Sequence, residues 1–138
     1  MTARLTGGCL CGAVRYECGG DPVVSLNCHC RDCQKATGGA CSASVFVPID
    51  SLTVTGNVKY YEKAGDSGHS ISRGFCPECG SALFGKPAVM AGLVSIRPGT
   101  LDDPTLFQPG FDMYSASAQP WDHMDPALVK FPTVPPQA

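Results

Sequence analysis

Seven of the nine cysteines in this 138-residue chain lie in three short clusters. Thiolate sulfur is a preferred ligand of Zn²⁺, which takes four ligands in a tetrahedral arrangement. Two closely spaced cysteines can fill two of those four positions, so such spacing indicates metal binding. The clusters are Cys9 with Cys11, Cys28 with Cys30 and Cys33, and Cys76 with Cys79, whereas Cys18 and Cys41 stand apart.

The last cluster has the composition of a metal-binding turn, because Pro77 and Gly80 favour a tight reversal of the backbone around its two thiols. It supplies two ligands and needs two more. The pair Cys9 and Cys11 is its natural complement. We therefore predict a closed, structural zinc site formed by Cys9, Cys11, Cys76 and Cys79, which would join two distant parts of the chain and contribute to folding.

The middle cluster has three thiols, and three protein ligands with one open position are typical of a catalytic zinc site. We therefore predict a second, catalytic zinc on Cys28, Cys30 and Cys33. A short helix over residues 32–37, ended by Gly38 and Gly39, would place Cys33 in a first turn, where the helix dipole favours thiolate.

Two alternatives remain for the cysteines. A fourth side chain would turn the second site into a closed structural one, and we expect the His29 ring to point away from the metal. Disulfides are the other alternative, but a bridge between cysteines separated by one residue is strained, and cytosolic thiols are kept reduced. The candidate fourth ligands are His29, Asp32, Cys41, His69 and His123.

Composition narrows the class of protein. The net charge is −2 and the Lys and Arg residues are scattered, which argues against nonspecific binding of nucleic acid and leaves only sequence-specific contacts open. The longest apolar stretch, residues 89–96, is shorter than the roughly 20 residues that cross a bilayer, and residues 1–8 contain no apolar signal core. We expect a cytoplasmic protein with one domain over residues 1–130 and a loose tail over residues 131–138.

The segments around the clusters resemble three signatures of the glutathione-dependent formaldehyde-activating enzyme family, whose domain is also called centromere protein V-like. These segments are residues 7–16, 28–38 and 75–81. Residues 99–104 resemble a turn late in such domains, and Pro120 with Trp121 resembles their terminal aromatic signature. The resemblance therefore covers nearly the whole chain.

The resemblance implies a mainly β, Mss4-like fold with short helical turns, one structural zinc on four cysteines, and a second zinc on three cysteines that can meet the thiol of glutathione. It also implies addition of glutathione to formaldehyde to give S-hydroxymethylglutathione, and the reverse cleavage, a carbon–sulfur lyase reaction. The addition also proceeds uncatalysed, so such a domain could carry the adduct instead. The alternative function is a noncatalytic zinc-binding module that binds a partner.

The elements that must position these thiols are short, because 16 Gly and 12 Pro disfavour long helices. Alternating apolar residues predict strands, and residues 122–124 could form a second helical turn. We expect Trp121 to close the core, and Cys18 and Cys41 to be buried as small apolar residues. The predicted strands are residues 13–17, 43–47, 52–55, 58–62, 70–75, 82–84, 89–96 and 111–114.

Overall fold

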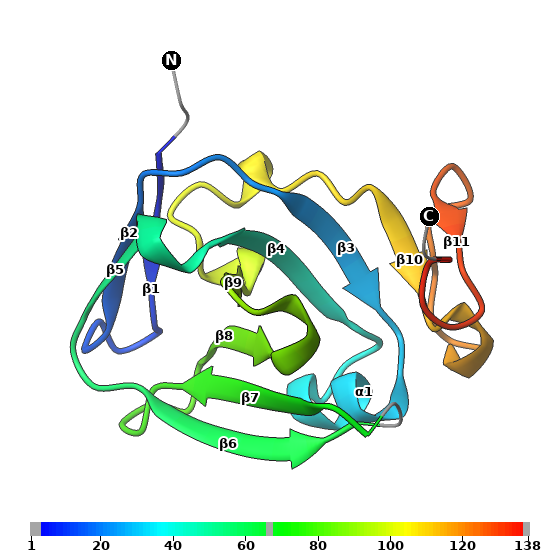
Figure 1. Cartoon of the computed structure of the whole chain (residues 1–138), viewed down its shortest axis with the longest axis horizontal. Coiled ribbons are helices and arrows are strands. Elements are labelled where there is room, and N and C mark those ends of the chain that lie inside the picture. Colours follow the sequence, from blue (N-terminus) through cyan, green and yellow to red (C-terminus); the bar gives the residue numbers. More distant parts are fainter. Residues whose placement is uncertain (1–3, 66–67, 137–138) are drawn as a thin grey trace.

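A computed structural model describes residues 4–65 and 68–136 and confirms the mainly β fold (Figure 1). Within these residues the chain forms eleven strands, one α-helix and five 3₁₀ turns. The helix is α1 (Arg31–Thr37). The strands are β1 (Leu5–Gly8), β2 (Arg15–Cys18), β3 (Val24–Cys28), β4 (Ser42–Pro48), β5 (Leu52–Thr55), β6 (Lys59–Ala64), β7 (Ser70–Phe75), β8 (Ala82–Pro87), β9 (Leu93–Ile96), β10 (Phe111–Met113) and β11 (Val129–Lys130).

The strands form two sheets. The smaller sheet has the order β1-β2-β5, and the larger has the order β11-β10-β3-β4-β9-β8-β7-β6. Strand β10 runs parallel to both β3 and β11, and the other pairs are antiparallel. The small sheet lies beside β4 and β9, and α1 follows the end of β3 (Figure 1). Parts of the chain that are distant in sequence therefore meet at the end of β3.

The main core lies between the two sheets. Tyr16 on β2 and Phe84 on β8 are both buried, and their rings pack edge to face with centroids 5.4 Å apart. The Tyr16 hydroxyl is 2.7 Å from the Thr100 hydroxyl, so its buried polar atom has a partner. This contact fixes the small sheet on the larger one.

All eight predicted strands are present at least in part, but one of them is much shorter than predicted and three further strands were not predicted. Strands β5 and β7 have the predicted bounds, and α1 begins one residue earlier than predicted. The short strands β1, β3 and β11 were not predicted. Residues 89–96 were predicted as one strand, but they contain the end of a 3₁₀ turn, a glycine at φ +89° (Gly92) and only then β9.

Three expectations about side chains and turns can be compared with the structure. The prediction of a helical turn at residues 122–124 was wrong, because that segment has neither helix nor turn. The expectation for Trp121 was also wrong, since 60% of its surface is exposed. Cys18 is buried as expected, whereas Cys41 is only partly buried.

The start of the predicted tail is held by hydrogen bonds. The Phe131 N–H donates to the Asp112 carbonyl at 2.9 Å, and the Tyr114 N–H donates to the Thr133 carbonyl at 2.8 Å. The Phe131 ring also packs edge to face on Phe111, with centroids 5.4 Å apart. No helix in the described part of the chain has the length and apolar character needed to cross a membrane.

Candidate metal centres

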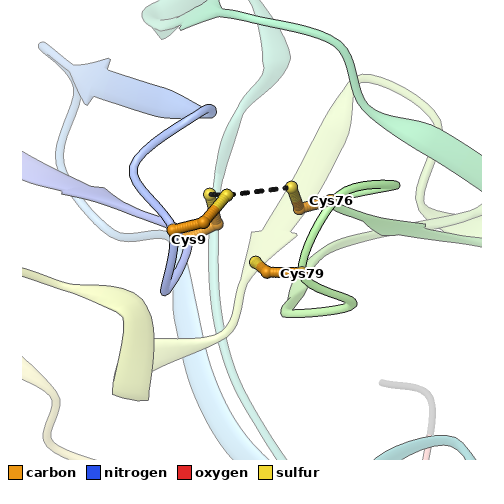
Figure 2. A group of neighbouring side chains, drawn as sticks. Cys9, Cys76 and Cys79 are labelled. Atoms are coloured by element: carbon orange, nitrogen blue, oxygen red, sulfur yellow. Dashed lines mark hydrogen bonds between the residues drawn. The ribbon is translucent and has the colours of Figure 1, made fainter.

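The first cysteine cluster brings together two loops from distant parts of the chain. Cys9 and Cys11 follow β1, and Cys76 and Cys79 follow β7. Figure 2 shows Cys9 facing Cys76 and Cys79 across the gap between these loops. The four sulfur atoms all lie within 4.8 Å of one another.

The spacing of these sulfurs fits a tetrahedral zinc. Zn–S bonds of about 2.3 Å at tetrahedral angles require sulfurs about 3.8 Å apart. The Cys9 and Cys11 sulfurs are 3.6 Å apart, and the Cys11 and Cys76 sulfurs are 3.8 Å apart. The four thiols predicted to form a closed site are therefore close enough together to hold one metal ion.

Local hydrogen bonds shape each loop around its thiols. The Cys9 sulfur accepts from the Val14 N–H at 3.2 Å, and the Gly80 N–H donates to the Cys76 carbonyl at 2.8 Å. Gly80 has φ +79°, a conformation that a side chain would strain. The reversal that presents Cys76 and Cys79 therefore depends on glycine.

Ser81 connects the two loops. Its hydroxyl oxygen accepts from the Leu10 N–H at 3.0 Å and lies 3.2 Å from the Cys79 sulfur. Hydrogen bonds from the Ser81 side chain and backbone lower the pKa of Cys79 to about 5, which favours the thiolate form that a metal requires. Sequence reasoning missed this residue, although its position directly after the Cys76–Gly80 turn is a usable signal.

The second cluster lies where β3 leads into α1. Cys28 ends β3, Cys30 is the N-cap of α1, and Cys33 lies in the first turn. Their sulfurs lie within 4.8 Å of one another, and the Cys30 sulfur accepts from the Cys33 N–H at 3.4 Å. Cys28 and Cys33 are buried and Cys30 is half-buried, so Cys30 is the most exposed thiol of the cluster.

No fourth His, Cys, Asp or Glu joins this cluster among residues 4–65 and 68–136. Both His29 ring nitrogens are engaged away from it, by Asp122 and Asp112. The Asp32 carboxylate pairs instead with Lys63 Nζ, at 2.9 and 3.0 Å. The remaining candidates, Cys41, His69 and His123, also lie outside the group.

The surroundings of His29 were not found from the sequence. Its Nδ1 is 2.5 Å from Asp122 Oδ2, its Nε2 is 2.8 Å from Asp112 Oδ1, and all three side chains are at most 7% exposed. The Gln34 amide donates to the His29 carbonyl at 2.7 Å. These hydrogen bonds hold His29, which lies between Cys28 and Cys30 in the sequence, in one position. Asp112 reaches His29 because β10 pairs in parallel with β3, a pairing that the sequence alone does not reveal.

Residues 4–117 match the family model described as "Glutathione-dependent formaldehyde-activating enzyme". The chain belongs to this family. The matched region contains all seven clustered cysteines, so the family resemblance seen in the sequence is confirmed. Membership rests on most of the chain rather than on one motif.

Curated relatives of the family match a shorter region. A Phaeosphaeria nodorum protein, provisionally named a glutathione-dependent formaldehyde-activating enzyme, is 35% identical over 80 residues, which are 56% of this chain and 42% of that protein. Proteins of Penicillium rubens and Aspergillus oryzae with the same provisional name are each 34% identical, over 54% and 61% of this chain and 44% and 46% of their own lengths. The chain thus spans less than half the length of the curated relatives it matches.

A crystal structure of a Rhodobacter sphaeroides protein shares the fold. It aligns with a TM-score of 0.60 and 16% identity over 91% of this chain and 98% of its own. The arrangement of the two sheets is therefore found in another protein of very different sequence.

Proposed function

We propose that the chain is a zinc enzyme that catalyses the reversible addition of glutathione, or another thiol, to an aldehyde such as formaldehyde. In the forward direction, the addition of the thiol to the aldehyde, a carbon–sulfur bond forms and the thiol proton moves to the aldehyde oxygen. In the reverse direction an adduct such as S-hydroxymethylglutathione is cleaved, which is a carbon–sulfur lyase reaction. Family membership supports the reaction class. The observation that carries the proposal is the convergence of three thiols without a fourth ligand among the described residues.

In this proposal the two clusters have different roles. Cys9, Cys11, Cys76 and Cys79 hold a structural zinc, whereas Cys28, Cys30 and Cys33 hold the catalytic zinc and leave one position for the substrate. A zinc ion bound there lowers the pKa of a coordinated thiol and polarises a carbonyl oxygen.

The residues of the chain hold and orient the second centre. The Cys33 N–H donates to the Cys30 sulfur, and a hydrogen bond of this kind stabilises negative charge on sulfur. The buried His29 keeps the backbone between Cys28 and Cys30 in one position, so the three sulfurs remain convergent when a ligand arrives. The partly exposed Cys30 side is the entrance for a thiol adduct.

Metal analysis tests the difference between the sites. We expect about two zinc ions per chain, with X-ray absorption showing one four-sulfur shell and one shell of three sulfurs and a light atom. Cys30→Ala should lose about one zinc ion, and Cys41→Ala, the matched control outside the cluster, should lose none. Two four-sulfur shells in the wild-type protein would contradict the proposed open site.

Turnover tests the reaction itself. We expect the zinc-loaded protein to increase the exchange rate between glutathione, formaldehyde and their adduct, measured by NMR above the uncatalysed rate without protein. Removal of the second zinc in Cys30→Ala should return exchange to that background. A rate equal to the background for every thiol–aldehyde adduct tried would contradict the enzyme proposal.

The second candidate is a noncatalytic zinc-binding module that carries an adduct or binds a partner. It is favoured by the limited match to the curated relatives, which extends over 42% of the Phaeosphaeria nodorum protein. This candidate predicts binding of a thiol adduct without accelerated exchange.

We also propose a cytoplasmic location, because nine free cysteines are maintained more readily in a reducing compartment.

A further inference from the structure

A cavity at the end of α1, the helix that carries Cys33, is lined by two arginines. Its volume is about 130 Å³, and its walls come from the end of α1, from β7 and β8, from Gly80 in the turn that follows Cys79, and from Arg97 directly after β9. Ala36, one turn beyond Cys33 on α1, and Thr37 line it as well. The Thr37 hydroxyl donates to the Cys33 carbonyl at 2.9 Å, so the cavity and the cluster share this helix.

Strand register brings the two guanidinium groups to one face of the large sheet. Arg73 on β7 pairs with Gly85 on β8, and Gly85 pairs with Ser95 on β9. Arg97 follows Ser95 by two residues, the spacing that returns a side chain to the same face of a strand. A Cβ atom at Gly85 would lie 3.5 Å from Arg97 Nη2 and 2.6 Å from Ser95 Oγ. The glycine thus leaves room for the Ser95 hydroxyl, and the Arg97 guanidinium group lies in contact distance of the same position.

Both arginines retain hydrogen-bonding capacity that the described residues do not satisfy. Arg73 Nε is buried and has no hydrogen-bond partner there. Arg97 Nη1 donates to Ser44 Oγ at 2.6 Å and to the Ala43 carbonyl at 3.4 Å. Neither arginine forms an ion pair with a carboxylate in the described chain. Buried cationic donors without partners are costly, so an anion in this cavity would be stabilised.

The negative charge of the second cysteine cluster does not by itself neutralise the two arginines. Burial lowers the pKa of Arg97, and negative charge on the Cys33 sulfur opposes that shift. Three thiolates and one Zn²⁺ carry a net charge of one minus, whereas two guanidinium groups carry two plus. The three thiolates and the zinc ion alone would therefore not neutralise both guanidinium groups, although a substrate thiolate would add one further negative charge.

We infer that the cavity between Arg73 and Arg97 binds a carboxylate group of the thiol substrate while its sulfur is at the second cysteine cluster. This inference rests on the proposed function and specifies its substrate class, a thiol that carries a carboxylate. Guanidinium groups bind carboxylates through paired N–H donors. The cavity is smaller than the roughly 300 to 1,000 Å³ typical of whole-ligand pockets, so it receives one end of the substrate.

Calorimetric titration of the zinc-loaded protein tests the inference without measuring turnover. The ligands are glutathione and its diethyl ester, which has the same thiol but no carboxylate. We expect the wild-type protein to bind glutathione at least roughly tenfold more tightly than the ester, in accord with the strength of hydrogen bonds to charged groups. Arg73→Met, which keeps the aliphatic part of the side chain, should lose most of this preference.

The control is Arg4→Met, which removes the same charge from an exposed ion pair with Glu17 on the small sheet. It should keep the full preference. Arg97→Met should act like Arg73→Met, with thermal unfolding measured because Arg97 also bonds to β4. Equal affinities of the wild-type protein for the two ligands, an unchanged preference in Arg73→Met, or the same loss in Arg4→Met would each overturn the inference. Failure of the proposed function is distinguishable, because it would abolish accelerated exchange and leave the arginine-dependent preference intact.

Discussion

The Nε2 atom of His29 lies 2.8 Å from Oδ1 of Asp112, and both side chains are 2% exposed. The other carboxylate oxygen of Asp112, Oδ2, lies 3.3 Å from Lys130 Nζ. The three residues come from the end of β3, from β10 and from β11. This contact therefore couples the loop that carries Cys28 and Cys30 to the C-terminal strands.

Asp112→Ala should lower the free energy of unfolding by about 3 kcal/mol or more, because it leaves the buried Nε2 atom of His29 without an acceptor and Lys130 without its carboxylate partner. Urea denaturation of the zinc-loaded protein measures this change. The control is Asp21→Ala at an exposed position, which should change the free energy by less than about 0.5 kcal/mol. Similar small effects in both variants would show that the His29 contact contributes little to stability.

The two cysteine clusters should differ in their importance for folding. Cys76→Ala breaks the site that joins the loops after β1 and β7, and a structural zinc contributes on the order of 10 kcal/mol to folding in small domains. We expect this variant to lose cooperative thermal unfolding. Cys30→Ala should remain folded, since its cluster lies within one local segment. Equal loss of structure in both variants would contradict the assignment of structural and catalytic roles.

Asp102 should make stability depend on pH. Hydrogen bonds from Arg15 at 2.6 and 3.0 Å, and from the Thr6 hydroxyl at 2.8 Å, hold the pKa of its carboxyl group below the usual value. A carboxyl group whose pKa is lower in the folded state stabilises the fold at pH values above its unfolded pKa of about 3.9, and this contribution is lost as the pH falls through its folded pKa.

The measurement compares the wild-type protein with Asp102→Asn between pH 6 and pH 3. We expect the free energy of unfolding to fall less steeply in the variant over this range, because its side chain does not titrate. Asp21→Asn is the control and should follow the wild-type curve. Comparing variants at the same pH also removes any effect that acid has on the thiol clusters of both proteins. Parallel curves for the wild type and Asp102→Asn would refute this role.

Local spacing explains which features the sequence predicted. Each cysteine cluster is contained in a few residues, so the sequence alone shows that it can supply two or three ligands to a metal ion. The hydrogen bond between His29 and Asp112 is different, because it depends on the pairing of β3 with β10. The juxtaposition of Arg73 and Arg97 likewise depends on three paired strands. Chemistry that is assembled across strands has no local signal in a single sequence.

The missed strand β1 has a separate physical cause. Its sequence includes Gly7 and Gly8, which normally favour turns. A Cβ atom at Gly7 would lie 2.3 Å from both the Thr100 carbonyl oxygen and the Tyr16 hydroxyl oxygen. The glycine is present because the neighbouring chain approaches too closely for a side chain, and the requirement becomes visible only when the small sheet packs on the Thr100 turn.

Gly56 provides a test of how firmly the first metal-binding loop is held. Its φ is +98°, and a Cβ atom there would lie 2.1 Å from the Ala13 carbonyl oxygen, next to Val14, whose N–H donates to the Cys9 sulfur. Gly56→Ala should therefore lower the free energy of unfolding by more than about 2 kcal/mol, from backbone strain and the collision together.

Thermal unfolding measures this effect, and zinc analysis after dialysis against a weak chelator shows whether the first site also loses affinity. Gly19→Ala is the matched control, because Gly19 has no positive φ and no atom would lie within 4 Å of its Cβ. That variant should be unchanged or more stable by up to about 1 kcal/mol, since alanine reduces the freedom of the unfolded chain. If Gly56→Ala unfolds at the same temperature as Gly19→Ala, the loop can move to accept a side chain and is not held by this contact.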